Sequence, residues 1–174
     1  MSFIAFAMVL MAQEKALYPS SVVGTDFDFI VDGDLDVFEE LFPKGEGTAE
    51  MPDKRDSTKE LRETAFLFEA RFRDNAKISI AIDAAFKTED EARKEALRYT
   101  PRLGKLPSAL RQGLRRLVVH RGGEDTTAFS DEGLIVVYSD NATKRIGTHD
   151  LEETIFHESV HAAWDKAHRA SEAW

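Results

Sequence analysis

A chain of 174 residues with a formal charge of −9 at pH 7 and no cysteine excludes several classes of protein. The length suits one domain with a sizeable core. The acidic balance argues against a nucleic-acid partner, because phosphates require a basic face. We interpret the local basic cluster of Arg111, Arg115, Arg116 and Arg121 as a solvated helix face. Without cysteine there are no disulfides, no thiolate zinc sites and no thiol nucleophile.

The first twelve residues are almost entirely apolar but too few to span a bilayer. They have the length of the apolar core of a signal peptide, and Ala12 before Gln13 suits cleavage, although a basic segment before them is missing. We therefore expect residues 1–12 to be a clipped export signal on a secreted or periplasmic protein that has no membrane contact after processing. The alternative is an apolar first strand of a cytoplasmic protein.

The next segment, residues 13–60, is expected to be an irregular N-terminal extension. It includes a predicted short helix at residues 35–41 and a loop at residues 43–60, which are rich in proline, glycine and charge. Residues 61–174 are expected to form the folded domain.

The sequence of the first half of that domain predicts a β-hairpin followed by helices. Isoleucines alternate with small residues in the second strand, which indicates one buried face. Thr88, with Glu91 three residues later, forms a capping box that opens a helix, and Pro101 and Gly104 are expected to end it. The predicted elements are strands 64–73 and 77–83, a turn at 74–75, and helices from Thr88 to about Tyr99 and from Pro107 to Leu114.

Two further apolar strands are predicted at residues 117–120 and 134–138, before a last helix that starts at about Leu151. Asp150 with Glu153 resembles a second capping box at the start of that helix. This order of strands and helices predicts an α+β fold, with a twisted mixed or antiparallel sheet and helices on one face.

The last predicted helix carries the segment His157-Glu158-Ser159-Val160-His161, an H-E-x-x-H motif. Residues four apart on a helix lie above one another, about 5–6 Å between Cβ atoms, so two imidazoles can reach one Zn²⁺ at roughly 2.0–2.1 Å. The glutamate points about 100° further round, toward the metal-bound water. Zinc ligands at His157 and His161 with Glu158 as general base are the expected chemistry. The alternative is a core helix whose histidines bond to carbonyls.

The motif places the chain with the zincin metallopeptidases, and a strand before the motif helix resembles their N-terminal half. A closer resemblance is to a poorly characterised group of bacterial, often exported, zinc peptidases. It is carried by residues 127–145, 148–154 and 157–161, and weaker similarity extends back to about Phe66. The resemblance implies a zincin-like domain at 61–174, with the active-site helix at its C-terminus, a Zn²⁺ cofactor and a peptide or protein substrate.

Zincins complete their site with a third protein ligand, usually after the motif helix, whereas only thirteen residues follow His161 here and none is glycine. We expect this ligand from beyond Trp174 or from a neighbouring chain. Asp165 and His168 are alternatives only if the helix unwinds, because on a straight helix they lie about 12 Å and 16 Å along the axis from His157. The upstream residues His149 and His120 are a third option, although both are more typical of structural histidines.

The leading expectation is therefore a zinc-dependent peptidase domain in which a metal-activated water attacks the peptide bond. Tyr138, Arg145 and His149 are weak candidates for an oxyanion donor. Two alternatives stay open: a binding module on a zincin scaffold with an incomplete metal site and no catalysis, and an ordinary structural domain with core histidines. The substrate preference and the oligomeric state do not follow from the sequence.

Overall fold

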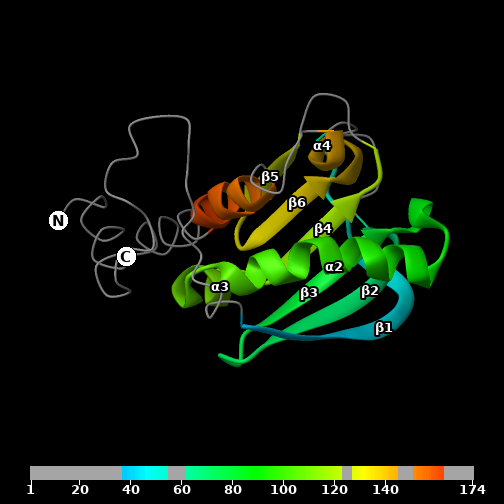
Figure 1. Cartoon of the computed structure of the whole chain (residues 1–174). Helices are drawn as coiled ribbons and strands as arrows, with labels where there is room; N and C mark the ends of the chain where they lie inside the picture. The colour runs from blue at the N-terminus through cyan, green and yellow to red at the C-terminus, as the bar shows by residue number, and fades with distance from the viewer. Residues whose placement is uncertain (1–36, 55–61, 123–126, 145–150, 163–174) are drawn as a thin grey trace, which may run out of the picture.

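The computed structural model describes residues 37–54, 62–122, 127–144 and 151–162 (Figure 1). The strands are β1 (Phe38–Glu50), β2 (Arg62–Phe72), β3 (Lys77–Asp83), β4 (Arg116–His120), β5 (Ala128–Asp131) and β6 (Leu134–Tyr138). The labelled helices are η2 (Ala84–Phe86), α2 (Glu89–Lys105), α3 (Ser108–Gly113) and α4 (Ser139–Lys144). Residues 151–162 are also helical and are called the motif helix below. None of these helices combines the length and the apolar character that crossing a bilayer requires.

The strands form one mixed sheet in the order β1-β2-β3-β4-β6-β5. The pairs β1–β2, β2–β3 and β5–β6 are antiparallel, whereas β3–β4 and β4–β6 are parallel. Parallel neighbours need a long crossover, and α2 with α3 supplies the one between β3 and β4. The predicted α+β class with a mixed sheet is confirmed.

The two faces of the sheet carry separate apolar clusters. Ile78, Ile80 and Ile82 of β3 point to one face, where they pack with α2 and the motif helix. Ala81, between them, belongs to the cluster on the other face. The alternation predicted from β3 thus decides which side receives the helices, and α2 lies across that side in Figure 1. The prediction of helices on one face is confirmed for the described helices that pack on the sheet.

Strand β1 corrects the predicted N-terminal boundary. Residues 38–50, expected as a short helix and a loop, pair with β2 from Phe38↔Phe72 to Glu50↔Arg62. Register shifts at Phe38/Glu40 and Pro43/Gly45 accommodate the proline and glycine that looked like loop signals, as bulges at a sheet edge do. The folded domain therefore includes residues that were assigned to the irregular extension 13–60. Residues 1–36, with the expected signal segment, lie outside the described ranges.

Helix α2 begins as predicted but ends later. The hydroxyl of Thr88 accepts a hydrogen bond from the Glu91 N–H at 3.2 Å, which confirms the cap. The helix continues through Pro101 to Lys105 because Tyr99 and Leu103, on either side of the proline, are fully buried. Tertiary packing outweighs the lost backbone hydrogen bond. Strand β5 and helix α4 were not predicted.

Candidate metal centre

The motif helix is held on the sheet by one buried face. Leu151, Ile155, Ser159 and Ala162 are buried and recur at intervals of three or four residues. The Ser159 hydroxyl donates to the carbonyl of Ile155 at 2.6 Å, so this buried polar group is satisfied inside the helix. Because these residues face the core, the residues on the opposite side of the helix, including both motif histidines, face solvent.

The helix is also tied to its neighbour by an ion pair. Lys105 Nζ, at the end of α2, lies 2.9 Å from Glu152 Oε1. Glu152 stands one turn before the motif, so the contact fixes the helix against α2 close to the candidate site. Both side chains are partly exposed, and a pair of this kind contributes at most about 1 kcal/mol. The buried apolar face therefore supplies most of the attachment.

The two motif histidines point toward one another. His157 Nε2 and His161 Nε2 are 3.0 Å apart, and the ring centroids are 4.6 Å apart at an interplanar angle of 70°. Both residues are exposed. In a metal-free chain, one ring donates its Nε2–H to the other. The arrangement therefore brings two nitrogen donors to one solvent-accessible point, as the spacing predicts.

This geometry fits a shared zinc ion. Two nitrogen ligands at about 2.0–2.1 Å on a tetrahedral ion are separated by roughly 3.3 Å. The observed 3.0 Å reaches that value with a small rotation of either ring. Glu158, between the histidines in sequence, is half-buried and sits nearer the packed face than they do. The two imidazoles thus suit a shared cation.

Within residues 37–54, 62–122, 127–144 and 151–162, no group of three or more histidine, aspartate or glutamate side chains forms a metal cluster. Two of the predicted ligands are therefore brought together without a described third. Asp165, His168 and His149, each considered as the third ligand, lie outside these ranges, as does the oxyanion candidate Arg145.

The remaining described candidates have structural partners. His120 is fully buried; its Nε2 donates to the Pro52 carbonyl at 3.0 Å, and its ring stacks on Tyr138 at 5.6 Å. The Tyr138 hydroxyl donates to Asp53 Oδ1 at 2.9 Å and accepts from the Lys54 N–H at 3.0 Å. These contacts account for both residues as parts of the fold rather than as a ligand or an oxyanion donor.

The predicted solvated arginine face is wrong for Arg111. Its side chain is 4% exposed and lies 2.5 Å from Asp74 Oδ2 through Nη2. Through Nη1 it also donates to the carbonyls of Leu103, Gly104 and Leu106 at the end of α2. The carbonyls at a helix C-terminus need donors, and Arg111 supplies them from the following helix, α3.

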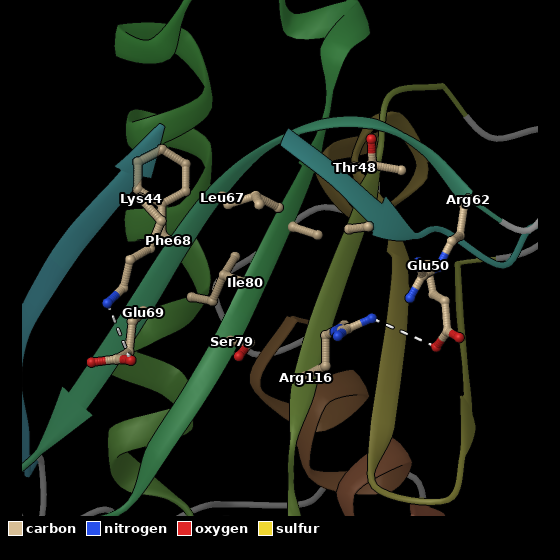
Figure 2. A pocket seen from close by; sticks show the side chains of 12 residues that line it. Lys44, Thr48, Glu50, Arg62, Leu67, Phe68, Glu69, Ser79, Ile80 and Arg116 are labelled. Carbon is tan, nitrogen blue, oxygen red and sulfur yellow. Dashed lines mark ion pairs between the residues drawn. The ribbon is translucent and has the colours of Figure 1, made fainter. Parts of the chain in front are cut away.

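Sequence reasoning missed a cavity of about 200 Å³ on the face of the sheet that α2 and the motif helix leave uncovered (Figure 2). Its charged lining residues are Lys44, Glu50, Arg62, Glu69 and Arg116. They come from three strands and are spread over more than seventy residues of sequence, so no local pattern could have grouped them.

No family model, no curated protein and no solved structure matches this chain. What the motif helix and the sheet can do therefore follows from the chemistry and geometry of their own residues.

Proposed function

We propose that this chain is a zinc-dependent peptidase domain of the zincin type. The observation that carries the proposal is the 3.0 Å separation of the two Nε2 atoms of His157 and His161 on the exposed side of a helix. If the two histidines served only to pack the helix, their rings would face the core and bond to carbonyl groups there. These rings instead face solvent, where a cation and a substrate can reach them.

The motif residues have distinct roles in this proposal. His157 and His161 would hold Zn²⁺ through Nε2, and a third protein ligand would come from outside the described residues. When bound, zinc acts as a Lewis acid and lowers the pKa of a coordinated water toward about 7. Glu158 would accept the proton of the attacking water and pass it to the leaving amine.

The sheet offers a means of holding an extended peptide. Strand β5 stands at one end of the strand order and pairs with β6 alone among the described strands. An extended chain can add to such an edge through main-chain hydrogen bonds. Ala128 of β5 packs on the same apolar cluster as Phe156 of the motif helix, one residue before His157. A peptide substrate along β5 is therefore part of the proposal.

The Glu158→Gln variant tests the catalytic assignment. It should keep stoichiometric zinc after dialysis, measured by elemental analysis, and lose cleavage of a mixed peptide library by at least about 100-fold, because proton transfer by a positioned group contributes about 10²–10⁴-fold. His157→Ala is the matched control: it should lose zinc and cleavage together while stability changes by less than about 0.5 kcal/mol, since the residue is exposed.

Two results would contradict the proposal. Full cleavage by Glu158→Gln would remove this residue from catalysis. Wild-type protein that keeps no zinc after dialysis and cleaves no peptide would instead favour a non-catalytic binding module on the same scaffold.

A further inference from the structure

The face of the sheet opposite α2 and the motif helix carries a cavity lined by charged and apolar side chains. Beyond the bulge at Pro43/Gly45, the last part of β1 stays paired with the first part of β2, and Figure 2 shows the end of β1, at Thr48 and Glu50, in front of this face. Gly45 has a φ of 80°, a conformation that glycine adopts without strain. The half-open cavity of about 200 Å³ lies between β1 and strands β2 to β4. A cavity of this volume suits a small molecule.

The charges around this cavity are unevenly distributed. Its lining has three cationic and two anionic side chains, a net charge of +1 in a chain whose formal charge is −9. At one end, Glu69 lies 2.7 Å from Arg71 Nε and 3.5 Å from Lys44 Nζ, and the hydrogen bond from Arg71 holds the pKa of Glu69 below its usual value. The Glu69 carboxylate at this end is therefore already paired with cations of the protein itself.

At the other end, one carboxylate faces two guanidinium groups. Glu50 is the direct cross-strand partner of Arg62, and its Oε2 lies 3.7 Å from Arg116 Nη1. Both arginines point toward Glu50 in Figure 2. The 3.7 Å contact is longer than a hydrogen bond, and the Glu50 side chain is 51% exposed. Such a loose, solvated pair contributes little stability, so a second carboxylate can displace it.

The floor between the two ends is apolar. Ala49, Leu67 and Ala81 line the cavity and belong to the apolar cluster of this face. A ligand that places its charged group near the arginines therefore meets an aliphatic surface behind them. Guanidinium groups bind planar carboxylates by paired hydrogen bonds, which lysine cannot reproduce.

We propose that this cavity binds a small aliphatic monocarboxylate, held by Arg62 and Arg116 in place of Glu50, with its hydrocarbon part on Leu67 and Ala81. Glu50 acts as an internal competitor that occupies the arginines when the ligand is absent. The site lies on the opposite face of the sheet from the motif helix, so it does not depend on the peptidase proposal.

Butyrate is the probe, and n-butylammonium is the matched probe of opposite charge. We expect butyrate to bind the wild-type protein with a dissociation constant on the order of 1 mM, measured by titration of amide NMR signals. The largest shifts should fall on β2 and β3 around Leu67 and Ala81. Butyrate shifts confined to residues 151–162 would show binding at the motif site and would overturn the proposal, as would equal binding of n-butylammonium.

Three variants sharpen the test. Arg116→Ala should weaken butyrate binding about tenfold, the value of one charge-assisted hydrogen bond, whereas Glu50→Gln should tighten it several-fold because the internal competitor is gone. Lys94→Ala removes the same charge from an exposed position on α2 and should leave affinity within about twofold. Amide spectra with wild-type dispersion establish that each variant is folded. Unchanged or weaker binding by folded Glu50→Gln would refute the competitor role and the proposal with it.

Discussion

The described histidines of this chain differ in what surrounds each ring. His120 is fully buried, and it bonds to a carbonyl and stacks on a tyrosine. His157 and His161 are exposed, and their Nε2 atoms lie 3.0 Å from one another. A buried ring needs fixed partners to offset desolvation, whereas an exposed ring can exchange water for a metal ion. Exposure therefore separates the structural histidine from the candidate ligands.

The environment of His120 also involves an ionised aspartate at the end of β3. Burial raises the pKa of Asp83, whereas the His120 ring and the backbone N–H groups of Ala85 and Arg121 lower it, and the lowering prevails. The Ala85 N–H lies 2.9 Å from Oδ1 and the Arg121 N–H 3.3 Å from Oδ2. The His120 Nδ1 atom lies 3.7 Å from Oδ2 of the same carboxylate.

The lowered pKa of Asp83 makes the stability of the protein fall at low pH. The folded pKa of Asp83 is below the unfolded value of about 3.9, so its stabilisation is complete well above pH 4 and is lost as pH falls through the folded pKa. Asp83→Asn should cost about 1–2 kcal/mol at pH 7 and flatten the decline in stability below about pH 4, measured by urea unfolding. Asp90→Asn, at an exposed position, is the control; an equal flattening there would contradict the assignment.

Among the helices, the junction of α2 and α3 is bridged by the buried side chain of Arg111. Arg111 joins Asp74, in the β2–β3 turn, to the carbonyls at the end of α2. Burial raises the pKa of Asp74, but the hydrogen bonds from Arg111, the Ala76 N–H and Ser108, together with the charge of Arg111, outweigh it and the pKa is lowered. Three elements meet at this one guanidinium, which is why it is buried although the sequence suggested a solvated face.

Removal of that guanidinium should be costly. Arg111→Ala removes the cation paired with the Asp74 carboxylate and the donor to several carbonyls, so the free energy of unfolding should fall by about 3 kcal/mol in urea titrations. Arg111→Lys should recover part of the lost stability, since lysine keeps the positive charge but lacks the several N–H donors of the planar guanidinium group. Arg115→Ala, where an exposed arginine bonds to the Glu132 carbonyl, should cost less than about 1 kcal/mol. Equal losses for Arg111→Ala and Arg115→Ala would refute this account of the junction.

Across the sheet as a whole, residues 51–54 connect β1 to the far strands. Met51 is 1% exposed and belongs to the apolar cluster on the face of the sheet opposite α2. The Pro52 carbonyl accepts a hydrogen bond from His120 on β4, and Asp53 and Lys54 bond to the hydroxyl of Tyr138 on β6. Lys54 Nζ also lies 4.3 Å from the ring centroid of Phe129 on β5. The chain after β1 thus crosses to β4, β5 and β6, which β2 and β3 separate from β1 in the strand order.

Tyr138→Phe tests this crossing. The variant keeps the ring that stacks on His120 but loses the hydroxyl that bonds to Asp53 and Lys54. Stability should fall by about 1 kcal/mol, and the Lys54 amide should lose protection in hydrogen-exchange measurements. Tyr99→Phe removes a buried hydroxyl, bonded to Glu95 at 2.7 Å, from α2. This control variant should leave hydrogen exchange at the Lys54 amide unchanged. If the Lys54 amide stayed protected in Tyr138→Phe, the hydrogen bond between Lys54 and Tyr138 would be refuted.

Local sequence patterns were sufficient to predict many of the helices and strands of this protein. Strands β2, β3, β4 and β6, the start of α2 and the helical motif segment were predicted because their signals lie within a few residues: apolar runs, alternation and a Thr88 cap. The convergence of His157 and His161 follows from the helix repeat for the same reason. The H-E-x-x-H spacing therefore carries the candidate metal centre without tertiary information.

Other features depend on partners that are distant in sequence. Strand β1 has few buried apolar residues, so its sequence resembles that of a loop, and its pairing with β2 makes it a strand. In β5 only Phe129 is buried. The exposure of the motif rings, the burial of Arg111 and the cationic cavity at Arg62 and Arg116 were likewise decided by the fold. The spacing of residues in the sequence determines which side chains lie on the same face of one helix or strand. Burial and charge pairing depend instead on which helices and strands the chain brings together.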